Sequence, residues 1–267
     1  MSDTTLGDRT RTVIHPTAQV DDDAELGAGV SVGPWAIIGP GVRVGDGTEI
    51  GPRVLIERDT VVGEDCRLSN GAVLGTDPQD LKYQGEHTVL TVGDRTVIRE
   101  FATLNRGTAA TGRTTVGSDC LLMAYTHVAH DCELGNHVIL SNAVNMAGHV
   151  TIEDWAIVGG LTPIHQFVRI GAHAFVGGGS RIPQDVPPYC RCAGNPPKLY
   201  GLNSVGLERR GFGEDVRSAL KRAYRVLFQS KMNLSQALAR VEEDVPMVPE
   251  VGHLVGFIRA SERGVTQ

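Results

Sequence analysis

A repeat of six residues runs through most of this chain. Counting in sixes from Ile14 to Ile182 reaches 29 positions, and 26 of them are Ile, Val, Leu or Met. Because six is a multiple of two, side chains at this spacing can all point to one face of an extended chain. On an α-helix with 3.6 residues per turn they would drift around the axis. Each hexad is therefore predicted to form a short strand and a turn.

Two further positions of the hexad fit this prediction. A small or β-branched residue follows the aliphatic one after four positions, as at Ala18 and Ala24. The residue directly after the aliphatic one is often glycine, as at Gly27, Gly33 and Gly39. We expect these glycines to allow backbone geometry that a side chain would strain.

A single strand cannot bury its inner face alone, so successive coils must stack as in other solenoids. Enclosing the aliphatic side chains contributes roughly 1.5–3 kcal/mol each, most of which is offset by the entropy of ordering the chain. We therefore predict a parallel β-helix, an all-β solenoid. The alternative, an α/β protein with a parallel sheet, requires the spacing to be coincidental.

The repeat is interrupted twice and ends near residue 187. Asp80, Glu86 and Ala110 break the pattern in two stretches that we interpret as insertions, the first being a projecting loop of the kind that often carries function. We divide the chain into a polar N-terminal extension (1–13), the β-helix (14–187) with its loop insertion (76–91), a connecting loop (188–205) and a C-terminal helical domain (206–267). Within that domain, apolar periodicity predicts helices over 214–231, 234–243 and 249–263, the second capped by Asn233.

Composition excludes several classes of protein. A net charge of -6 and a pI near 5.8 argue against a nucleic-acid binder. No apolar stretch approaches the ~20 residues of a membrane span, and the polar start of the chain does not resemble a signal peptide. Cys66, Cys120 and Cys132 occupy small wall positions, which suggests reduced thiols. We expect a cytoplasmic protein.

The hexads, an aliphatic residue followed by glycine and then a small residue, resemble those of the hexapeptide acyltransferases. The resemblance implies a left-handed β-helix of triangular section, with three hexads in each coil, so that positions i and i+18 lie side by side. The hand comes from the resemblance alone, because the usual crossover rule favours the right hand. The 29 hexad positions would then make nine to ten coils.

A coil of three hexads turns sequence spacing into geometry. Adjacent coils lie about 4.8 Å apart, so His130 should lie beside Gly148, and Asp131 beside His149. An imidazole with an adjacent carboxylate can act as a general base, worth roughly 10²–10⁴ in rate, and a backbone N–H can stabilise an oxyanion by on the order of 10²–10³. Together these groups suit attack of a hydroxyl or amine on a thioester. The alternative is that they are unrelated surface histidines.

Seven runs of sequence make the resemblance more specific. They are similar to runs in the UDP-N-acetylglucosamine 3-O-acyltransferase family and occur in the family's order: 79–83, 117–123, 127–132, 147–150, 165–167, 184–189 and 206–212. The resemblance covers the chain from about Ile14 to its end. It implies transfer of a 3-hydroxyacyl chain from acyl carrier protein to the 3-position of UDP-N-acetylglucosamine, the first step of lipid A biosynthesis, with no cofactor and no metal.

The resemblance also implies a role for each matching residue. His130 would take the proton from the sugar 3-hydroxyl with Asp131 orienting it, and the Gly148 N–H would stabilise the oxyanion. Residues expected to hold the sugar and diphosphate or to line the same cleft are Gln79, Asp80, Lys82, His127, His149, His165 and Gln166. Residues expected near the donor or the nucleotide are Asn203, Arg209 and Arg210, and Gly178 would set the acyl-chain length by leaving room for a long chain.

The sequence departs from the family in two places. Val205 stands where many relatives carry an acidic residue, so no nucleotide contact is expected there, and Asn145 and Met146 are not the commonest residues of the sugar pocket.

The resemblance also implies partners. The family is homotrimeric with its cleft between subunits. The basic residues of the first helical stretch suit an acidic acyl carrier protein: Arg209, Arg210, Arg217, Lys221, Arg222 and Arg225.

Three other functions compete with this one. A γ-type carbonic anhydrase could use His127, His130 and His149 as zinc ligands, but its pair of histidines separated by four residues on one strand is absent. The related N-acyltransferase, which uses a 3-amino UDP-sugar, carries an additional N-terminal domain, for which a repeat starting at Ile14 leaves no room. A non-enzymatic solenoid would have a regular outer face without the histidine group and the loop.

Overall fold

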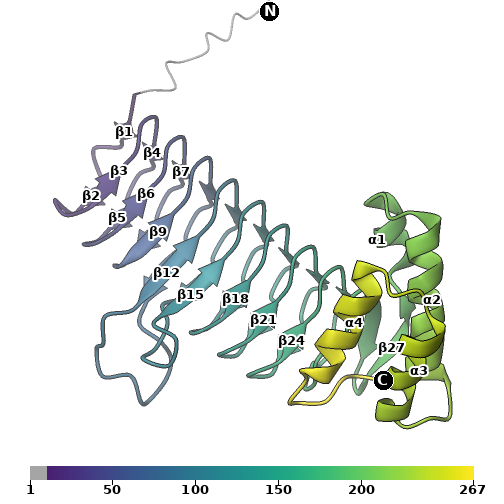
Figure 1. The fold of residues 1–267 in the computed structure, drawn as a ribbon. Helices are drawn as coiled ribbons and strands as arrows, with labels where there is room; N and C mark the ends of the chain where they lie inside the picture. The colour runs from purple at the N-terminus through teal and green to yellow at the C-terminus, as the bar shows by residue number, and fades with distance from the viewer. Residues whose placement is uncertain (1–10) are drawn as a thin grey trace, which may run out of the picture.

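The computed structural model describes residues 11–267. They form a left-handed parallel β-helix with three sheets as its walls, followed by a group of helices at its C-terminal end (Figure 1). Strands of two to four residues alternate with tight turns along the whole solenoid. The expected fold class is confirmed.

The strands of each sheet pair in parallel from coil to coil. Sheet A contains β1 (Val13–Ile14), β4 (Ser31–Val32), β7 (Glu49–Ile50), β10 (Arg67–Leu68), β13 (Val97–Ile98), β16 (Leu121–Leu122), β19 (Ile139–Leu140), β22 (Ile157–Val158) and β25 (Phe175–Val176). Sheet B contains β2 (Gln19–Val20), β5 (Ile37–Ile38), β8 (Leu55–Ile56), β11 (Val73–Thr76), β14 (Thr103–Asn105), β17 (His127–Val128), β20 (Asn145–Met146) and β23 (Pro163–Ile164). Sheet C contains β3 (Glu25–Leu26), β6 (Arg43–Val44), β9 (Thr60–Val62), β12 (Val89–Val92), β15 (Arg113–Val116), β18 (Glu133–Leu134), β21 (Thr151–Ile152) and β24 (Arg169–Ile170).

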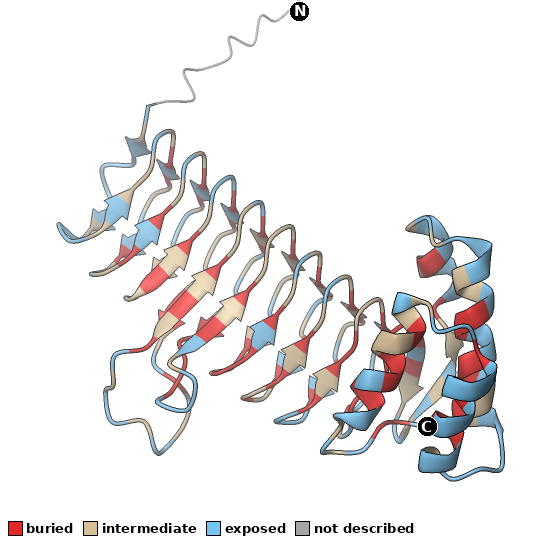
Figure 2. Cartoon of the chain, in the orientation of Figure 1, coloured by how far each residue is buried: buried red, intermediate tan, exposed pale blue. Residues whose placement is uncertain are grey.

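The aliphatic residue of each hexad points into the solenoid. In β6, for example, Arg43 is exposed and Val44 is buried, and the same alternation recurs along the walls (Figure 2). Equivalent residues of neighbouring coils stack directly, because Leu121 pairs with Ile139 and Leu122 with Leu140. The predicted alternation of inward and outward side chains is confirmed, and it creates one continuous apolar core.

The glycines that follow the aliphatic residues have a different purpose from the one expected. Gly27, Gly33 and Gly39 are not among the residues with positive φ. A Cβ on Gly39 would lie 1.8 Å from the carbonyl oxygen of Glu57, so the neighbouring coil leaves no room for a side chain. These positions require glycine because two backbones approach closely, so the expectation of relieved strain was wrong.

The left-handed residues lie instead at the corners, one position before the small wall residue. Asp131 and His149 have φ of 58° and 61°, although neither is glycine. Such a conformation costs roughly 1–2 kcal/mol per residue. The N–H of His149 donates to the carbonyl of His130 in the preceding coil, and Phe167 donates in the same way to Gly148. These bonds extend the ladder around the corner and help to offset the cost.

The two insertions appear as breaks in the regular register of sheet A. Leu121 pairs with Ile139 at the regular spacing of three hexads, whereas Arg67 pairs with Val97 and Val97 with Leu121. The first insertion therefore lengthens its coil by two hexads, and the second lengthens the next coil by one. Within residues 11–267, sheet A holds nine strands of the repeat, the lower end of the expected range, because the count of hexads included the inserted positions. The first loop is shorter than the expected 76–91, since β11 ends at Thr76 and β12 begins at Val89.

The segment 188–205, which was expected to be a connecting loop, differs from that expectation. It contains a hairpin of two strands, β26 (Cys190–Gly194) and β27 (Pro197–Leu202), which continues sheet A beyond β25. The Gly, Asn and Pro residues that suggested a loop form its tight turn. At the other end of the solenoid, residues 1–10 of the expected extension lie outside the described residues, and Val13 already pairs with Ser31.

Four helices follow the hairpin. They are α1 (Ser204–Arg209), α2 (Glu214–Gln229), α3 (Leu234–Asp244) and α4 (Pro249–Arg259). The sequence predicted the last three and missed α1, and α4 ends before the expected 263. Asn233 caps α3 in a capping box with Gln236, as its position predicted. The helices share a separate apolar core. No helix within residues 11–267 is long and apolar enough to cross a membrane.

Candidate active site

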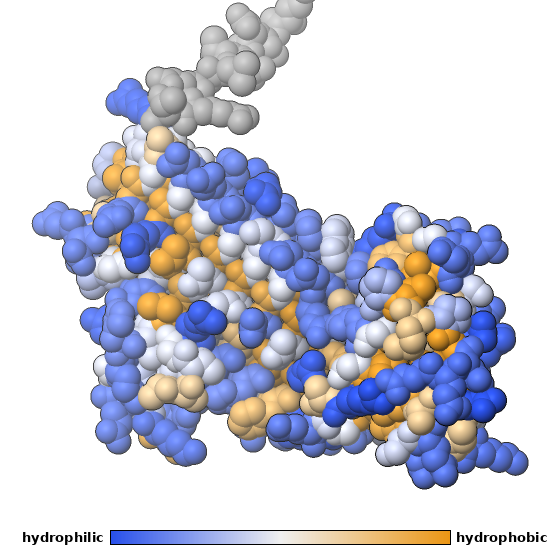
Figure 3. All heavy atoms as spheres, in the orientation of Figure 1, coloured by the Kyte–Doolittle hydropathy of each residue, from blue (hydrophilic) through white to orange (hydrophobic). Residues whose placement is uncertain are grey.

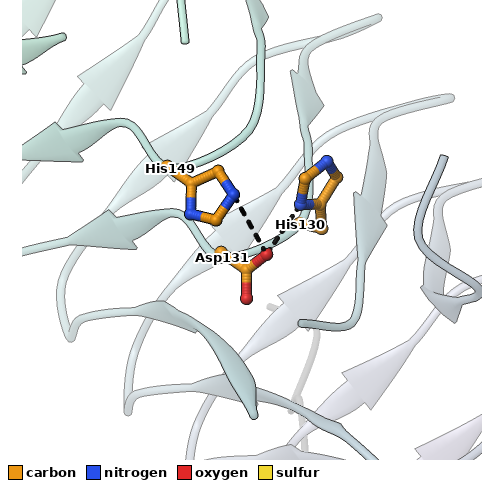
Figure 4. Close-up of side chains that lie close together, drawn as sticks. All are labelled: His130, Asp131 and His149. Carbon is orange, nitrogen blue, oxygen red and sulfur yellow. Dashed lines mark hydrogen bonds and ion pairs between the residues drawn. The ribbon is translucent and has the colours of Figure 1, made fainter. Parts of the chain in front are cut away.

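His130 and Asp131 lie in the corner that joins β17 to β18 (Figure 4). The Nδ1 atom of His130 is 2.7 Å from the Oδ2 atom of Asp131. The Asp131 side chain is fully buried, and 13% of the His130 side chain is exposed. Because Nδ1 is engaged by the carboxylate, Nε2 is the nitrogen left to exchange a proton with a substrate.

The second insertion supplies the other hydrogen bonds to Asp131. The Thr108 N–H donates to Oδ1 at 2.9 Å and the Thr108 hydroxyl to Oδ2 at 2.8 Å, while the Thr111 hydroxyl donates to Oδ1 at 2.5 Å. Burial alone would raise the pKa of Asp131, but the hydrogen bonds from Thr111, His130 and Thr108 outweigh it and lower the pKa to about 2. The carboxylate is therefore ionised at neutral pH, and its contribution to stability is lost only as pH falls from 3.8 towards 2.

Gly148 lies one coil beyond His130, as the repeat spacing predicts. A Cβ on Gly148 would lie 2.5 Å from Cε1 and 2.7 Å from Nε2 of His130, so the imidazole packs on the bare backbone. Among the hydrogen bonds of residues 11–267, none is donated by the Gly148 N–H. His149 lies next to Asp131, also as predicted, with Nε2 at 3.6 Å from Oδ2 and its ring stacked on Phe167.

A pocket of about 540 Å³ opens beside His130. It brings together Gln79, His127, His130, Gly148 and Gln166 from the expected set, with further lining from Thr103, Ala129, Asn145, Met146 and Ala147. The His127 Nδ1 atom is 2.7 Å from the Thr103 hydroxyl, and burial, followed by the nearby His130, lowers the pKa of His127. Thr103 was not among the predicted site residues, although its place beside His127 follows from the register of β14 and β17.

Several expected residues do not line this pocket. Asp80 is half-buried and Lys82 exposed on the loop, where the Lys82 N–H donates to the Asp80 carboxylate. His165 is exposed beside Gln166, and its Nδ1 is 3.1 Å from the Gln166 carbonyl. Gly178 packs against the backbone of the preceding coil near Gly160.

The residues of the C-terminal domain lie at a different corner, between sheets C and A. The Arg210 guanidinium lies 4.9 Å from the Trp155 ring and 3.5 Å from Nδ1 of His173. Asn203 is 6% exposed, and its side chain donates to the His173 carbonyl and accepts from the Gly206 N–H that starts α1. Arg209 lies on the exposed side of α1. Within one chain, these residues do not join the His130 pocket.

His130, Asp131 and His149 also bring potential metal ligands within 4.8 Å of one another. The Asp131 carboxylate, however, already accepts four hydrogen bonds, from the Thr108 N–H, two threonine hydroxyls and His130. These donors occupy the lone pairs that a cation would need. The arrangement therefore fits a carboxylate that orients a histidine better than it fits a zinc site.

Comparison with known proteins identifies relatives along the whole chain. The family described as UDP-N-acetylglucosamine O-acyltransferase, domain 2, matches residues 185–266, and the bacterial transferase hexapeptide family matches residues 41–76 and 113–145. An acyl-(acyl-carrier-protein)–UDP-N-acetylglucosamine O-acyltransferase of Anaeromyxobacter dehalogenans is 49% identical over 255 residues, which are 95% of this chain and 99% of that one. A relative of the same name from a Janthinobacterium species is 46% identical over 258 residues, 95% of this chain and 98% of that one.

Solved structures agree with the sequence relatives. The UDP-N-acetylglucosamine acyltransferase of Bacteroides fragilis superposes with a TM-score of 0.93 at 41% identity, over 95% of this chain and 99% of that one. The enzyme from Francisella novicida gives a TM-score of 0.92 at 34% identity, over 95% and 94% of the two chains. These matches include both the solenoid and the helices, and the chain belongs to the UDP-N-acetylglucosamine O-acyltransferase family.

Proposed function

We propose that the protein transfers a 3-hydroxyacyl chain from the thioester of acyl carrier protein to the 3-hydroxyl of UDP-N-acetylglucosamine, the step that opens lipid A biosynthesis. The observation that carries the proposal is the His130 imidazole, fixed by Asp131 and packed on Gly148, whose N–H donates no hydrogen bond among the described residues. Nε2 accepts the proton of the sugar hydroxyl as its oxygen attacks the thioester carbonyl. The Gly148 N–H stabilises the tetrahedral oxyanion. The C–S bond then breaks, and the thiolate takes the proton from the imidazolium.

The pocket suits an acceptor rich in hydroxyl groups. Gln79, His127 and Gln166 present polar side chains around His130, and we propose that they hold the sugar. His149 stabilises the position of Asp131, and His165 extends the same wall outward. Asp80 and Lys82 on the projecting loop bind the sugar and diphosphate from the rim.

We further propose that the cleft is completed by a neighbouring subunit of a homotrimer. Arg209 and Arg210 would otherwise lie at a corner of the solenoid that His130 does not occupy. Asn203, whose polar atoms are engaged within the chain, holds the start of α1, which carries Arg209. Apolar side chains also emerge on the outer walls (Figure 3), and one corner exposes Trp35, Phe101, Tyr125 and Leu161 by 47–73%. A subunit contact would cover such surface.

Two further proposals concern the acyl chain and the compartment. Gly178 offers no side chain to shorten the acyl-binding groove, which favours a longer 3-hydroxyacyl chain. All five cysteines are free and buried, as expected for a reducing compartment such as the cytoplasm.

The test of the reaction is product analysis. With a panel of 3-hydroxyacyl carrier proteins and UDP-N-acetylglucosamine, we expect mass spectrometry to find a product that carries one ester-linked acyl group and is cleaved by mild base. The 3-amino analogue should be a poorer acceptor. Preferential formation of a base-stable amide would instead assign the protein to the N-acyltransferases.

The donor has a matching surface on α2. Arg217, Lys221 and Arg225 line a groove of about 540 Å³ together with Tyr224 and residues of β27 and α1. We propose that acyl carrier protein, which is acidic, docks there, because complementary charge raises the rate of encounter.

Charge reversal tests this docking surface. We expect Lys221→Glu with Arg225→Glu to raise the KM for acyl carrier protein by roughly tenfold at low salt, and the difference to shrink as salt screens the charges. The KM for the UDP-sugar should not change. Arg43→Glu, an exposed reversal on β6, is the control. If the double variant and the Arg43→Glu control had the same KM for acyl carrier protein, the docking surface would lie elsewhere.

A further inference from the structure

The second insertion has a specific relation to the catalytic pair. The coil that runs from β13 to β16 is one hexad longer than the regular coil from β16 to β19. The added residues form the turn after β14, which carries Thr108 and Thr111 to the Asp131 carboxylate. Thr108 and Thr111 do not line the pocket, so they contact Asp131 rather than the acceptor.

The turn is held rigidly from its other side. Arg106 is 1% exposed, and its guanidinium donates to the Gly75 carbonyl at 2.9 Å and to the Thr88 carbonyl at 3.3 Å. It also pairs with Asp77 at the start of the projecting loop. A buried, multiply bonded arginine fixes the backbone on which the two threonines stand.

We infer that Thr108 and Thr111 are positioning residues that act on His130 through Asp131. The inference rests on the proposed role of His130 as the base. An Asp131 carboxylate bonded to His130 alone could rotate about its χ2 angle and turn the imidazole with it. Three donors from a fixed turn hold both carboxylate oxygens, so the Nδ1–H bond has one direction and Nε2 one position. The hydrogen bonds from the threonine hydroxyls also reduce the negative charge that the Asp131 carboxylate presents to His130. This limits how strongly the carboxylate stabilises the protonated imidazole.

Thr111→Val is the first test, because Thr111 is exposed and valine keeps its shape. We expect kcat to fall about tenfold, and by on the order of 10² when Thr108→Val is added, with the KM for the UDP-sugar within twofold. The acid limb of the pH–rate profile should move to higher pH, because fewer hydrogen-bond donors leave more negative charge on the Asp131 carboxylate facing the imidazole. Thr111→Ser, which keeps the hydroxyl, should restore both properties.

The matched control is Thr115→Val, on β15, whose hydroxyl makes no hydrogen bond among the described residues. A double-mutant cycle isolates the mechanism: in a His130→Ala background, Thr111→Val should have no further effect on the residual rate. The inference is overturned if Thr111→Val matches Thr115→Val in kcat and pH profile, or if its effect persists without His130. If His130→Ala is itself active, the proposed base is wrong, which is a distinct outcome.

Discussion

His130→Ala is expected to lower kcat by on the order of 10²–10⁴ while the protein remains folded. The imidazole is held by Asp131 at 2.7 Å and lies outside the apolar core of the solenoid, so its removal would eliminate the proposed proton acceptor without opening that core. The KM for the UDP-sugar should change much less than kcat, because a general base acts in the transition state. Single-turnover kinetics with a saturating acyl carrier protein thioester would measure the effect.

The pH dependence adds a second readout. Because the pKa of Asp131 is lowered to about 2, its carboxylate keeps its charge as the solution is acidified from neutral pH towards pH 4. A loss of kcat over that range cannot come from Asp131, and it would be assigned to His130 if it disappeared from the residual activity of His130→Ala. His15→Ala, an exposed histidine at the far end of the solenoid, is the control. Activity within a few-fold of wild type in His130→Ala would exclude His130 as the base.

Gly148→Ala is expected to lower kcat by on the order of 10² for a reason of space. The new methyl group would lie 2.5 Å from Cε1 and 2.7 Å from Nε2 of His130, and the ring cannot move away without weakening its bond to Asp131. The displaced imidazole would lose its alignment with the acceptor hydroxyl. The Gly148 N–H would remain, so the loss would measure the positioning of His130 rather than removal of the proposed oxyanion donor.

Gly252→Ala provides the matched control for that variant. Gly252 lies in α4, and a Cβ there meets no atom within 4 Å. This substitution should leave kcat unchanged and stabilise the helix by roughly 0.5–1 kcal/mol, because alanine loses less backbone entropy than glycine. If Gly148→Ala retained full activity, with a crystal structure showing the imidazole in place, the close packing of His130 on Gly148 would have no catalytic importance.

The sequence by itself determined the solenoid and the neighbours of His130 and Asp131. A repeat of six residues is compatible with extended chain and not with a helix, and stacked coils place residues three hexads apart side by side. For this reason the sequence predicted Gly148 next to His130, and His149 next to Asp131. The same reasoning located both insertions, because the aliphatic residue of the hexad is replaced by Asp80 and Glu86 in the first and by Ala110 in the second.

Only the tertiary structure decided what the insertions do and which residues share a pocket. The contacts of Thr108 and Thr111 with Asp131 join two neighbouring coils, and they depend on a turn that no repeat describes. The hairpin over 190–202 was not predicted because its turn residues resemble those of a loop, whereas its pairing with β25 is a tertiary contact that the local sequence does not specify. Periodicity specifies the wall because each hexad repeats the same local interactions, whereas the departures from the period are fixed by contacts between segments distant in sequence.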